Sequence, residues 1–317
     1  MHVEAPLVFI MGPTGAGKTA LALEIAARLA AEVVSVDSAQ VYRGLDLGTA
    51  KPSPAVRARV PHHLLDICAP DEAYSAARFR EDAQRAIAAV RARGRLPLLV
   101  GGTGLYFRAL EQGLAVLPPA DPAVRALLAA ELERDGAAAL HARLAALDAQ
   151  AAARIHPNDP QRLLRALEVH ELCGASLTSL WAAAQLAPHA GEIVKLVIAP
   201  NDRADLHRDL ATRYHGMLDR GLVNEVRALR ANPRLTAQAP AMRSVGYREV
   251  WRYLDGTCTR AEMIERGIVA TRQLAKRQLT WFRRENGALW LDSRDPARLD
   301  RALVRIAQAG RFPARGI

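Results

Sequence analysis

The hydrophobic pattern of the chain predicts an α/β fold. Short, continuous apolar runs are typical of strands that are buried on both faces of a sheet. Such runs occupy 7–11, 32–36, 96–100, 193–198 and 288–291. Stretches in which apolar residues recur every three or four positions separate most of these runs, as expected for helices that connect parallel strands. We therefore expect a mostly parallel sheet flanked by helices.

The segment 118–191 has a different pattern, because helical spacings follow one another there without an intervening apolar run. Asp121 and Asp159 each precede a proline, which combines a helix cap with the residue favoured at the first helical position. We therefore expect residues 1–117 and 192–317 to form the α/β core, and 118–191 to form an all-helical insertion.

A phosphate-binding loop follows the first predicted strand. The segment GPTGAGKT has two glycines separated by four residues and followed by lysine and a hydroxyl residue, and a predicted helix comes directly after it. Backbone N–H groups and the helix N-terminus would bind an anion there, Lys18 would bridge phosphate oxygens, and Thr19 would hold Mg²⁺. The predicted ligand is a di- or triphosphate. The loop residues expected to bind it are Gly12, Pro13, Thr14, Gly15, Ala16, Gly17, Lys18 and Thr19.

Residues at the ends of the next predicted strands add a carboxylate to this site. The carboxyl ends of strands in an open parallel sheet line the ligand crevice, so Asp37, after the second strand, is expected beside the phosphate loop. An ATPase would more often place a magnesium-binding aspartate after the third strand, where this chain has Gly101 and Gly102. His62 and His63 invite a metal interpretation, but no third ligand has a suitable spacing, and we favour structural histidines.

The charge balance points to a polyanionic partner. The chain has 43 basic and 33 acidic residues, a formal net charge of +10, and a pI of about 10.1. Residues 270–285 concentrate this charge around two aromatic residues, which favours phosphate contact with base stacking over a merely solvated surface. The basic residues there are Arg272, Lys276, Arg277, Arg283 and Arg284.

The remaining composition indicates the compartment. Three distant cysteines without a CxxC pair suit a reducing cytoplasm, and no apolar run is long enough to span a bilayer. We expect a cytoplasmic, monomeric protein without a membrane partner.

The order of several longer segments resembles that of the tRNA dimethylallyltransferases, also called isopentenyl-tRNA transferases, of the IPP transferase family. The similarity extends from about Leu7 to Arg284. The segments that carry it are GPTGAGKT, DSAQVYRGLDLGTAKP, PHHLLDI, LLVGGTGLY, HPNDPQRLLRALEV, RSVGYREVW and ATRQLAKRQLTWFR. The resemblance implies transfer of the dimethylallyl group of dimethylallyl diphosphate to N6 of the adenine 3′ of the tRNA anticodon, with Mg²⁺ as cofactor and diphosphate as product.

The resemblance also implies roles for individual residues. Asp37 would be the general base, whereas Lys18, Thr19 and Arg213 would bind the leaving diphosphate; Arg213 matches the family pattern better than Arg208. The helical insertion would contact the anticodon stem-loop, with Arg162 and Arg165 on one helix face. The positions that match tRNA-contacting motifs are Asp37, Ser38, Ala39, Gln40, Thr103, Arg125, Gln161, Arg162, Leu163, Leu164, Arg165, Arg243, Ser244, Lys276, Arg277, Gln278, Leu279, Thr280, Trp281, Phe282 and Arg283.

Other interpretations of the same residues stay open at this point. A small-molecule or nucleotide kinase would use the loop for ATP, the insertion as a lid, and Arg162 with Arg165 on the γ-phosphate. An ATP-dependent RNA-binding protein without catalytic activity is a third possibility. Asp37 could hold a magnesium-bound water instead of acting as a base, and Arg213 could be an ordinary surface arginine.

Overall fold

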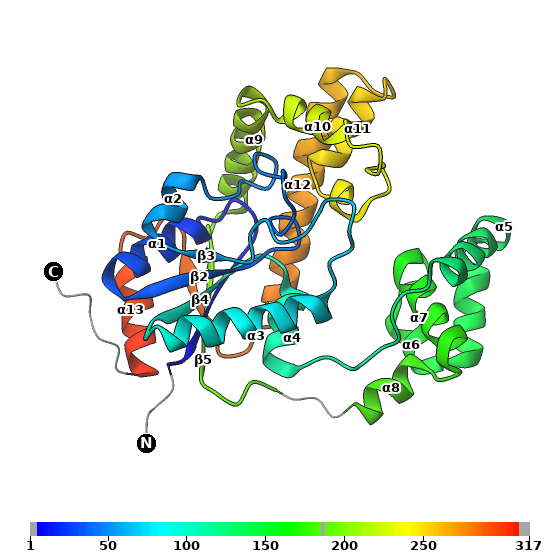
Figure 1. Cartoon of the computed structure of the whole chain (residues 1–317), viewed down its shortest axis with the longest axis horizontal. Helices are drawn as coiled ribbons and strands as arrows, with labels where there is room; N and C mark the ends of the chain where they lie inside the picture. The colour runs from blue at the N-terminus through cyan, green and yellow to red at the C-terminus, as the bar shows by residue number, and fades with distance from the viewer. Residues whose placement is uncertain (1–4, 185–187, 311–317) are drawn as a thin grey trace. The chain divides into compact units, whose positions relative to one another are not determined.

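The computed structural model describes residues 5–184 and 188–310, and its centre is one parallel sheet (Figure 1). Six strands lie in the order β3-β2-β4-β1-β5-β6, and every pairing is parallel. The strands are β1 Leu7–Met11, β2 Ala31–Val36, β3 His62–His63, β4 Leu96–Gly101, β5 Ile193–Ala199 and β6 Leu289–Asp292. The predicted α/β fold with a mostly parallel sheet is confirmed.

The two faces of β1 belong to two different hydrophobic clusters. Val8 and Ile10 pack with residues of α1 (Lys18–Arg28) and α13 (Arg298–Gln308). Leu7, Phe9 and Met11 lie in the cluster on the other face. That cluster takes residues from α3 (Ala76–Ala92), α4 (Gly104–Gln112) and the end of α12 (Arg260–Phe282). The uninterrupted apolar run of β1 is thus explained by burial on both faces.

The strand order brings three loops to one edge of the sheet. β4 lies between β1 and β2, with Val8 paired to Leu98 and Val33 paired to the same Leu98. Because all three strands run in the same direction, the loops that follow them meet at their carboxyl ends. The phosphate loop, the Asp37 turn and the Gly101–Thr103 turn are therefore neighbours.

A third cluster of side chains is built from the helices between β5 and β6. Tyr247 is fully buried there and holds the loop after β2, because its hydroxyl accepts a hydrogen bond from the Gly48 N–H at 3.1 Å. The elements of this layer are α9 Arg203–Asp219, α10 Leu222–Arg230, the 3₁₀ turn η1 Pro240–Arg243, α11 Tyr247–Leu254 and α12. Outside this cluster, the short helix α2, Pro54–Arg59, precedes β3.

Contacts divide the chain into two compact units, Met1–Glu111 with His189–Ile317, and Gln112–Pro188. The described elements of the second unit are all helical: α5 Pro122–Leu147, α6 Ala149–Arg154, α7 Pro160–Cys173 and α8 Leu177–Ala183. They enclose a core of their own, which includes Leu140, Leu144 and Leu167. None of the helices in the described part of the chain is both long and apolar enough to cross a membrane.

Candidate active site

The phosphate loop lies between β1 and α1 with the backbone geometry that its glycines allow. Gly15 and Gly17 both adopt left-handed conformations, with φ of 79° and 83°. A side chain at Gly12 would place its Cβ 2.2 Å from the Ile198 carbonyl oxygen, so the loop passes directly against β5. The Lys18 ammonium folds over the loop and donates to the carbonyl oxygens of Gly12 and Pro13 at 3.0 and 2.7 Å.

Three charged side chains act on one another at this edge of the sheet. Burial lowers the pKa of Lys18 to about 8, whereas the Asp37 carboxylate acts in the opposite direction and the Arg213 guanidinium adds to the lowering. Burial likewise lowers the pKa of Arg213, and Asp37 again opposes it. Arg208 is exposed and forms an ion pair with Asp205. Of the two arginines considered for this site, Arg213 is the one that lies within electrostatic reach of Asp37 and Lys18.

The carboxylate of Asp37 is held by its own turn. Its Oδ1 accepts hydrogen bonds from the N–H groups of Ala39 and Gln40 at 2.8 and 3.2 Å. Within residues 5–184 and 188–310, Oδ2 takes part in no hydrogen bond. The next residue, Ser38, donates its N–H to the Thr103 hydroxyl at 3.1 Å, which joins the end of β2 to the end of β4. The geometry fixes one carboxylate oxygen and leaves the other without a hydrogen-bond partner among the described residues.

Helix α12 contributes both an exposed basic surface and buried packing. The side chains of Lys276, Arg277, Thr280 and Arg283 are exposed, as a nucleic-acid contact would require. Phe282 is a correction to the sequence prediction, because it is fully buried with its ring 6.2 Å from that of Phe107 and cannot stack on a base.

Three further side chains of α12, Trp281, Gln278 and Leu279, have contacts within the protein. The Trp281 ring packs beside Gly104, and the Arg108 guanidinium covers it at 4.8 Å. Gln278 is bonded on both sides of its amide, to the Thr14 N–H and to the Gly102 carbonyl. Leu279 is half-buried against Leu206, Leu210 and Ala275. Sequence reasoning assigned these positions to tRNA and did not foresee their internal contacts.

In the insertion, two of the predicted arginines share one buried carboxylate. Glu168 is fully buried and accepts from Arg125 at 2.8 Å and from Arg165 at 2.7 Å. Burial acts to raise its pKa, but these hydrogen bonds outweigh burial and lower it. Leu163 is a second correction, since it is fully buried in the core of the insertion and has no surface to offer RNA. Gln161 and Arg162 are exposed, and Leu164 is half-buried.

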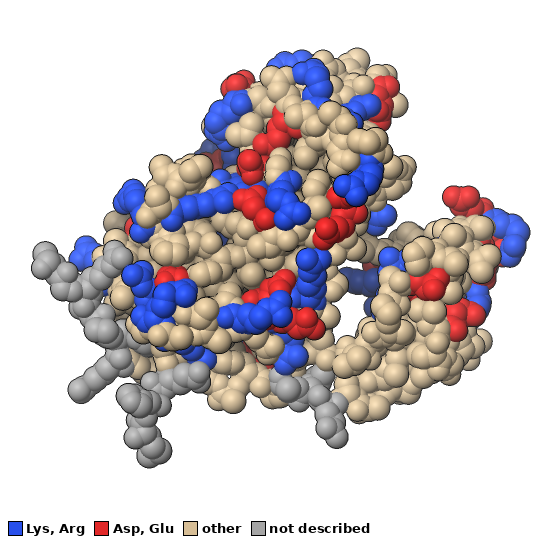
Figure 2. All heavy atoms as spheres, in the orientation of Figure 1, with Lys and Arg blue, Asp and Glu red and all other residues tan. Residues whose placement is uncertain are grey.

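The remaining predicted contacts lie outside these clusters or hold the polypeptide together. Arg243 is exposed at the end of η1 and donates to the Gln238 carbonyl at 3.2 Å, and Ser244 beside it is half-buried. Gln40 uses its amide within the protein, donating to the Thr49 carbonyl at 3.2 Å and receiving the Ser35 hydroxyl. On the face seen in Figure 2, basic side chains are spread among acidic ones rather than gathered in one patch.

The histidine pair and Lys51 have structural partners. His63 Nε2 lies 2.6 Å from Glu32, and His62 Nδ1 lies 2.6 Å from the Val60 carbonyl. The side chain of Lys51 is 1% exposed, and its ammonium donates to the Tyr42 carbonyl, Asp46 and Asp66. No group of three or more His, Cys, Asp or Glu that could hold a metal ion occurs among the residues that the structure describes.

The residues present nevertheless suit a magnesium ion that is held mainly by its substrate. Thr19 is exposed in the first turn of α1, directly after Lys18, at the helix end where an anion would bind. Mg²⁺ usually keeps several waters and binds through few protein ligands together with substrate phosphates. A single hydroxyl with diphosphate oxygens is therefore an adequate set of ligands.

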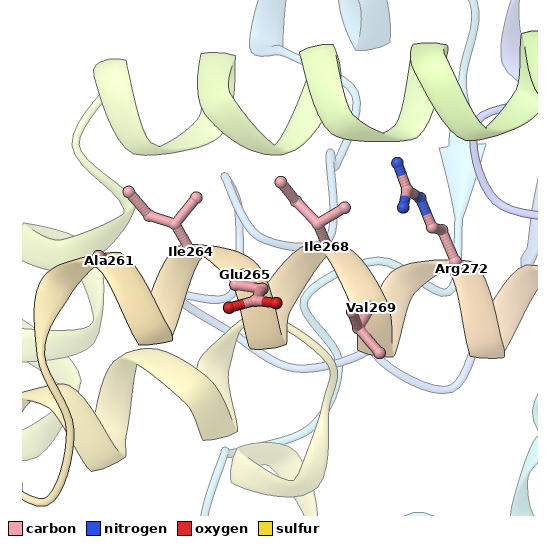
Figure 3. A pocket seen from close by; sticks show the side chains of 6 residues that line it. All are labelled: Ala261, Ile264, Glu265, Ile268, Val269 and Arg272. Atoms are coloured by element: carbon pink, nitrogen blue, oxygen red, sulfur yellow. The ribbon is translucent and has the colours of Figure 1, made fainter.

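A groove of about 470 Å³ lies away from these residues, along the first half of α12 (Figure 3). Ile264, Ile268 and Arg272 point toward α9, which packs along this helix, whereas Glu265 and Val269 point away from it. Of the six residues that line the groove, Arg272 alone belongs to the basic stretch predicted to contact nucleic acid.

Comparison with known proteins decides the family. A family model described as IPP transferase matches residues 40–285, and one described as isopentenyl transferase matches residues 5–60. The chain belongs to the IPP transferase family. It is 57% identical to a tRNA dimethylallyltransferase of Halorhodospira halophila, over 89% of this chain and 91% of that protein. It is 58% identical to one of Alkalilimnicola ehrlichii, over 90% of each chain.

Solved structures agree with this membership of the IPP transferase family. The tRNA isopentenylpyrophosphate transferase of Bacillus halodurans is 36% identical, with a TM-score of 0.69 over 96% of this chain and 97% of that one. A eukaryotic dimethylallyltransferase described as acting on tRNA is 25% identical, with a TM-score of 0.78 over 96% of this chain and 77% of that one. The resemblance found in the sequence is thereby confirmed.

Proposed function

We propose that this protein transfers the dimethylallyl group of dimethylallyl diphosphate to the exocyclic N6 of the adenine 3′ of the anticodon in tRNA, with release of diphosphate. The single observation that supports this best is the convergence of Lys18, Arg213 and Asp37 at the phosphate loop. Two cations beside the loop suit a leaving diphosphate, and one oriented carboxylate suits an acceptor that must lose a proton.

The donor half of the reaction needs stabilisation of negative charge. Cleavage of the allylic C–O bond leaves positive charge on the five-carbon group and negative charge on the departing diphosphate. Loop N–H groups, the Lys18 ammonium and the Arg213 guanidinium would stabilise that charge from fixed positions. A magnesium ion held by Thr19 would add Lewis-acid stabilisation of the same oxygens.

The acceptor half needs a base, because the lone pair of the adenine amino group is delocalised into the ring. Asp37 would remove the N6 proton as the C–N bond forms, using the Oδ2 atom that its turn leaves available. The adenine has to leave the stack of the anticodon loop to reach this carboxylate, as enzymes that modify bases commonly require.

Recognition of tRNA would rest on the exposed part of the predicted set. The exposed cations of this set are Lys276 and Arg277 on α12, Arg283 at the C-cap of that helix, Arg243 at the end of η1, and Arg162 in the insertion. Such side chains bind phosphates and set the register of an RNA without reading its sequence. We also propose that the protein acts in the cytoplasm as a monomer.

One assay separates this proposal from its rivals. The protein is incubated with tRNA and Mg²⁺, and with either dimethylallyl diphosphate labelled in the prenyl group or ATP labelled in the γ-phosphate. Prenyl label in the tRNA supports the proposal. Transfer of phosphate to any acceptor would instead indicate a kinase, and retention of tRNA without either transfer would indicate a binding protein.

A further inference from the structure

Gln278 occupies the point where three functional segments meet. From α12 its Oε1 accepts the Thr14 N–H of the phosphate loop at 2.8 Å. Its Nε2 donates to the Gly102 carbonyl, after β4, at 3.0 Å. The same turn continues to Thr103, whose hydroxyl accepts the Ser38 N–H beside Asp37. One side chain thus bonds the phosphate loop to the turn after β4, and that turn is bonded through Thr103 to Ser38, the neighbour of the proposed base.

The close approach of α12 explains two glycines of the GGTG segment. A Cβ at Gly102 would lie 2.2 Å from Gln278 Nε2, and a Cβ at Gly104 would lie 2.2 Å from Trp281 Cδ1. Neither glycine has the positive φ that would itself demand glycine. The absence of side chains at these two positions therefore makes room for Gln278 and Trp281, which lie about one turn apart on α12.

We propose that Gln278 is a positioning residue that couples α12 to the phosphate loop, and that it is not a contact for tRNA. Arg277 and Lys276 precede it on the same helix and are exposed, so RNA bound to them would act on a helix that is directly bonded to the loop. Both polar atoms of the Gln278 amide, Oε1 and Nε2, make a hydrogen bond within the protein, so a base could take the amide only by competing with these bonds or by using the second N–H of Nε2. The inference that this coupling serves catalysis rests on the proposed function, whereas the hydrogen bonds of Gln278 are observed independently of it.

The first experiment compares Gln278→Met with Gln273→Met. Met keeps the length of the side chain without its hydrogen bonds, and Gln273 is an exposed glutamine on the same helix, which serves as a matched control. Affinity for Mg-pyrophosphate is measured without tRNA, and affinity for an anticodon stem-loop RNA is measured without donor. Gln278→Met should weaken pyrophosphate binding about tenfold, equivalent to about 1.4 kcal/mol, and change RNA binding less than about twofold.

The second experiment displaces Gln278 without altering it. Gly102→Ala places a methyl group where the amide lies, so it should weaken pyrophosphate binding about as much as Gln278→Met. In a Gln278→Ala background the same methyl group has room, and Gly102→Ala should then cost little more. This double-mutant comparison stays informative even if one variant unfolds at a lower temperature, because each pair of proteins shares its background.

A positioning role of Gln278 and a direct contact of Gln278 with tRNA predict opposite results. Loss of RNA affinity with unchanged pyrophosphate affinity in Gln278→Met would overturn the proposal. So would an effect of Gly102→Ala that is equal in both backgrounds. A wild-type protein that binds pyrophosphate but transfers no prenyl group would refute the proposed function instead, and the comparison at position 278 would still be decided by the pyrophosphate measurements.

Discussion

Binding of diphosphate should be coupled to protonation of Lys18. Burial lowers the pKa of this ammonium to about 8 in the protein without ligand, despite the opposing effect of Asp37. A diphosphate at the loop would place negative charge beside the ammonium and favour its charged form, which raises the pKa. At pH 9 most of the free protein has lost this proton, whereas the complex retains it. Binding must therefore take up a proton there.

The size of the effect follows from that pKa. A group with a pKa of about 8 is about 10% deprotonated at pH 7 and about 90% deprotonated at pH 9. Proton uptake on binding should rise from about 0.1 to about 0.9 per site over this range, and the dissociation constant should rise about tenfold with it. Asp37→Asn removes the charge that opposes the lowering, so the transition should move to lower pH.

Titration calorimetry measures this uptake directly. The heat of pyrophosphate binding is recorded at pH 7, 8 and 9 in pairs of buffers that differ in ionisation enthalpy, and the difference within each pair gives the number of protons. Lys18→Arg is the control, because a guanidinium stays charged up to a pH of about 12. Its curve contains only the ionisation of pyrophosphate and of other groups. Equal uptake by the two proteins at pH 9 would refute the reasoning.

Three further predictions concern other parts of the site. Asp37→Asn keeps an oxygen that accepts from the Ala39 and Gln40 N–H groups but removes the base. Turnover should fall about 10²- to 10⁴-fold, while the affinity for tRNA stays within a few-fold of the wild-type value. Unchanged turnover would exclude Asp37 from the chemistry. Lys276→Met should reduce the slope of the logarithm of tRNA affinity against the logarithm of salt concentration by about one unit. Arg85 is exposed on α3, and Arg85→Met, as the control, should leave the slope unchanged. Equal slopes for the two variants would contradict a tRNA contact of Lys276. Lys51→Met leaves the carboxylates of Asp46 and Asp66 without the buried ammonium that bonds both. The free energy of unfolding, measured by urea denaturation, should fall by about 2 kcal/mol. Unaltered stability would show that these ion pairs contribute little.

The features that were predictable from the sequence are those specified by nearby residues. Asp159 caps α7 by accepting the Arg162 N–H, and Gly174 ends that helix in a left-handed conformation, so both bounds follow from local chemistry. Thr259 and Glu262 form a capping box at the start of α12. The phosphate loop is equally local.

Elements that depend on distant partners were not predicted. β3 has only two residues, and it is a strand because His62 pairs with Val33 of β2. α4 begins with a glycine, which reads as a loop in the sequence; its buried face, with Phe107 and Leu110, is defined by the sheet that it covers. No short window of sequence contains either relation.

The same limit explains the errors among the predicted contacts. A basic helix with aromatic residues has the composition of an RNA-binding surface, but composition does not say which side of the helix is buried. Phe282 lies on the side that packs against Phe107, whereas Arg283 next to it is exposed. For Gln278 the tRNA contact stays a prediction; its place in a motif does not show the bonds to Thr14 and Gly102, which only the fold brings to its amide.

Charge counted along the sequence also overstates the charge that is available to a polyanion. In the insertion, Arg162 and Arg165 lie on one helix face and were both expected to meet a phosphate track. In the structure the two side chains have different partners. Arg165 donates to the buried Glu168 and to the Pro118 carbonyl, whereas Arg162 is exposed and, among the described residues, its side chain pairs with Asp159 alone, at 3.4 Å. A buried carboxylate keeps its partner arginine in place, because the pairing offsets the free-energy cost of removing the carboxylate from water. The insertion should therefore engage phosphates through Arg162, while Arg165 maintains the helix that presents it.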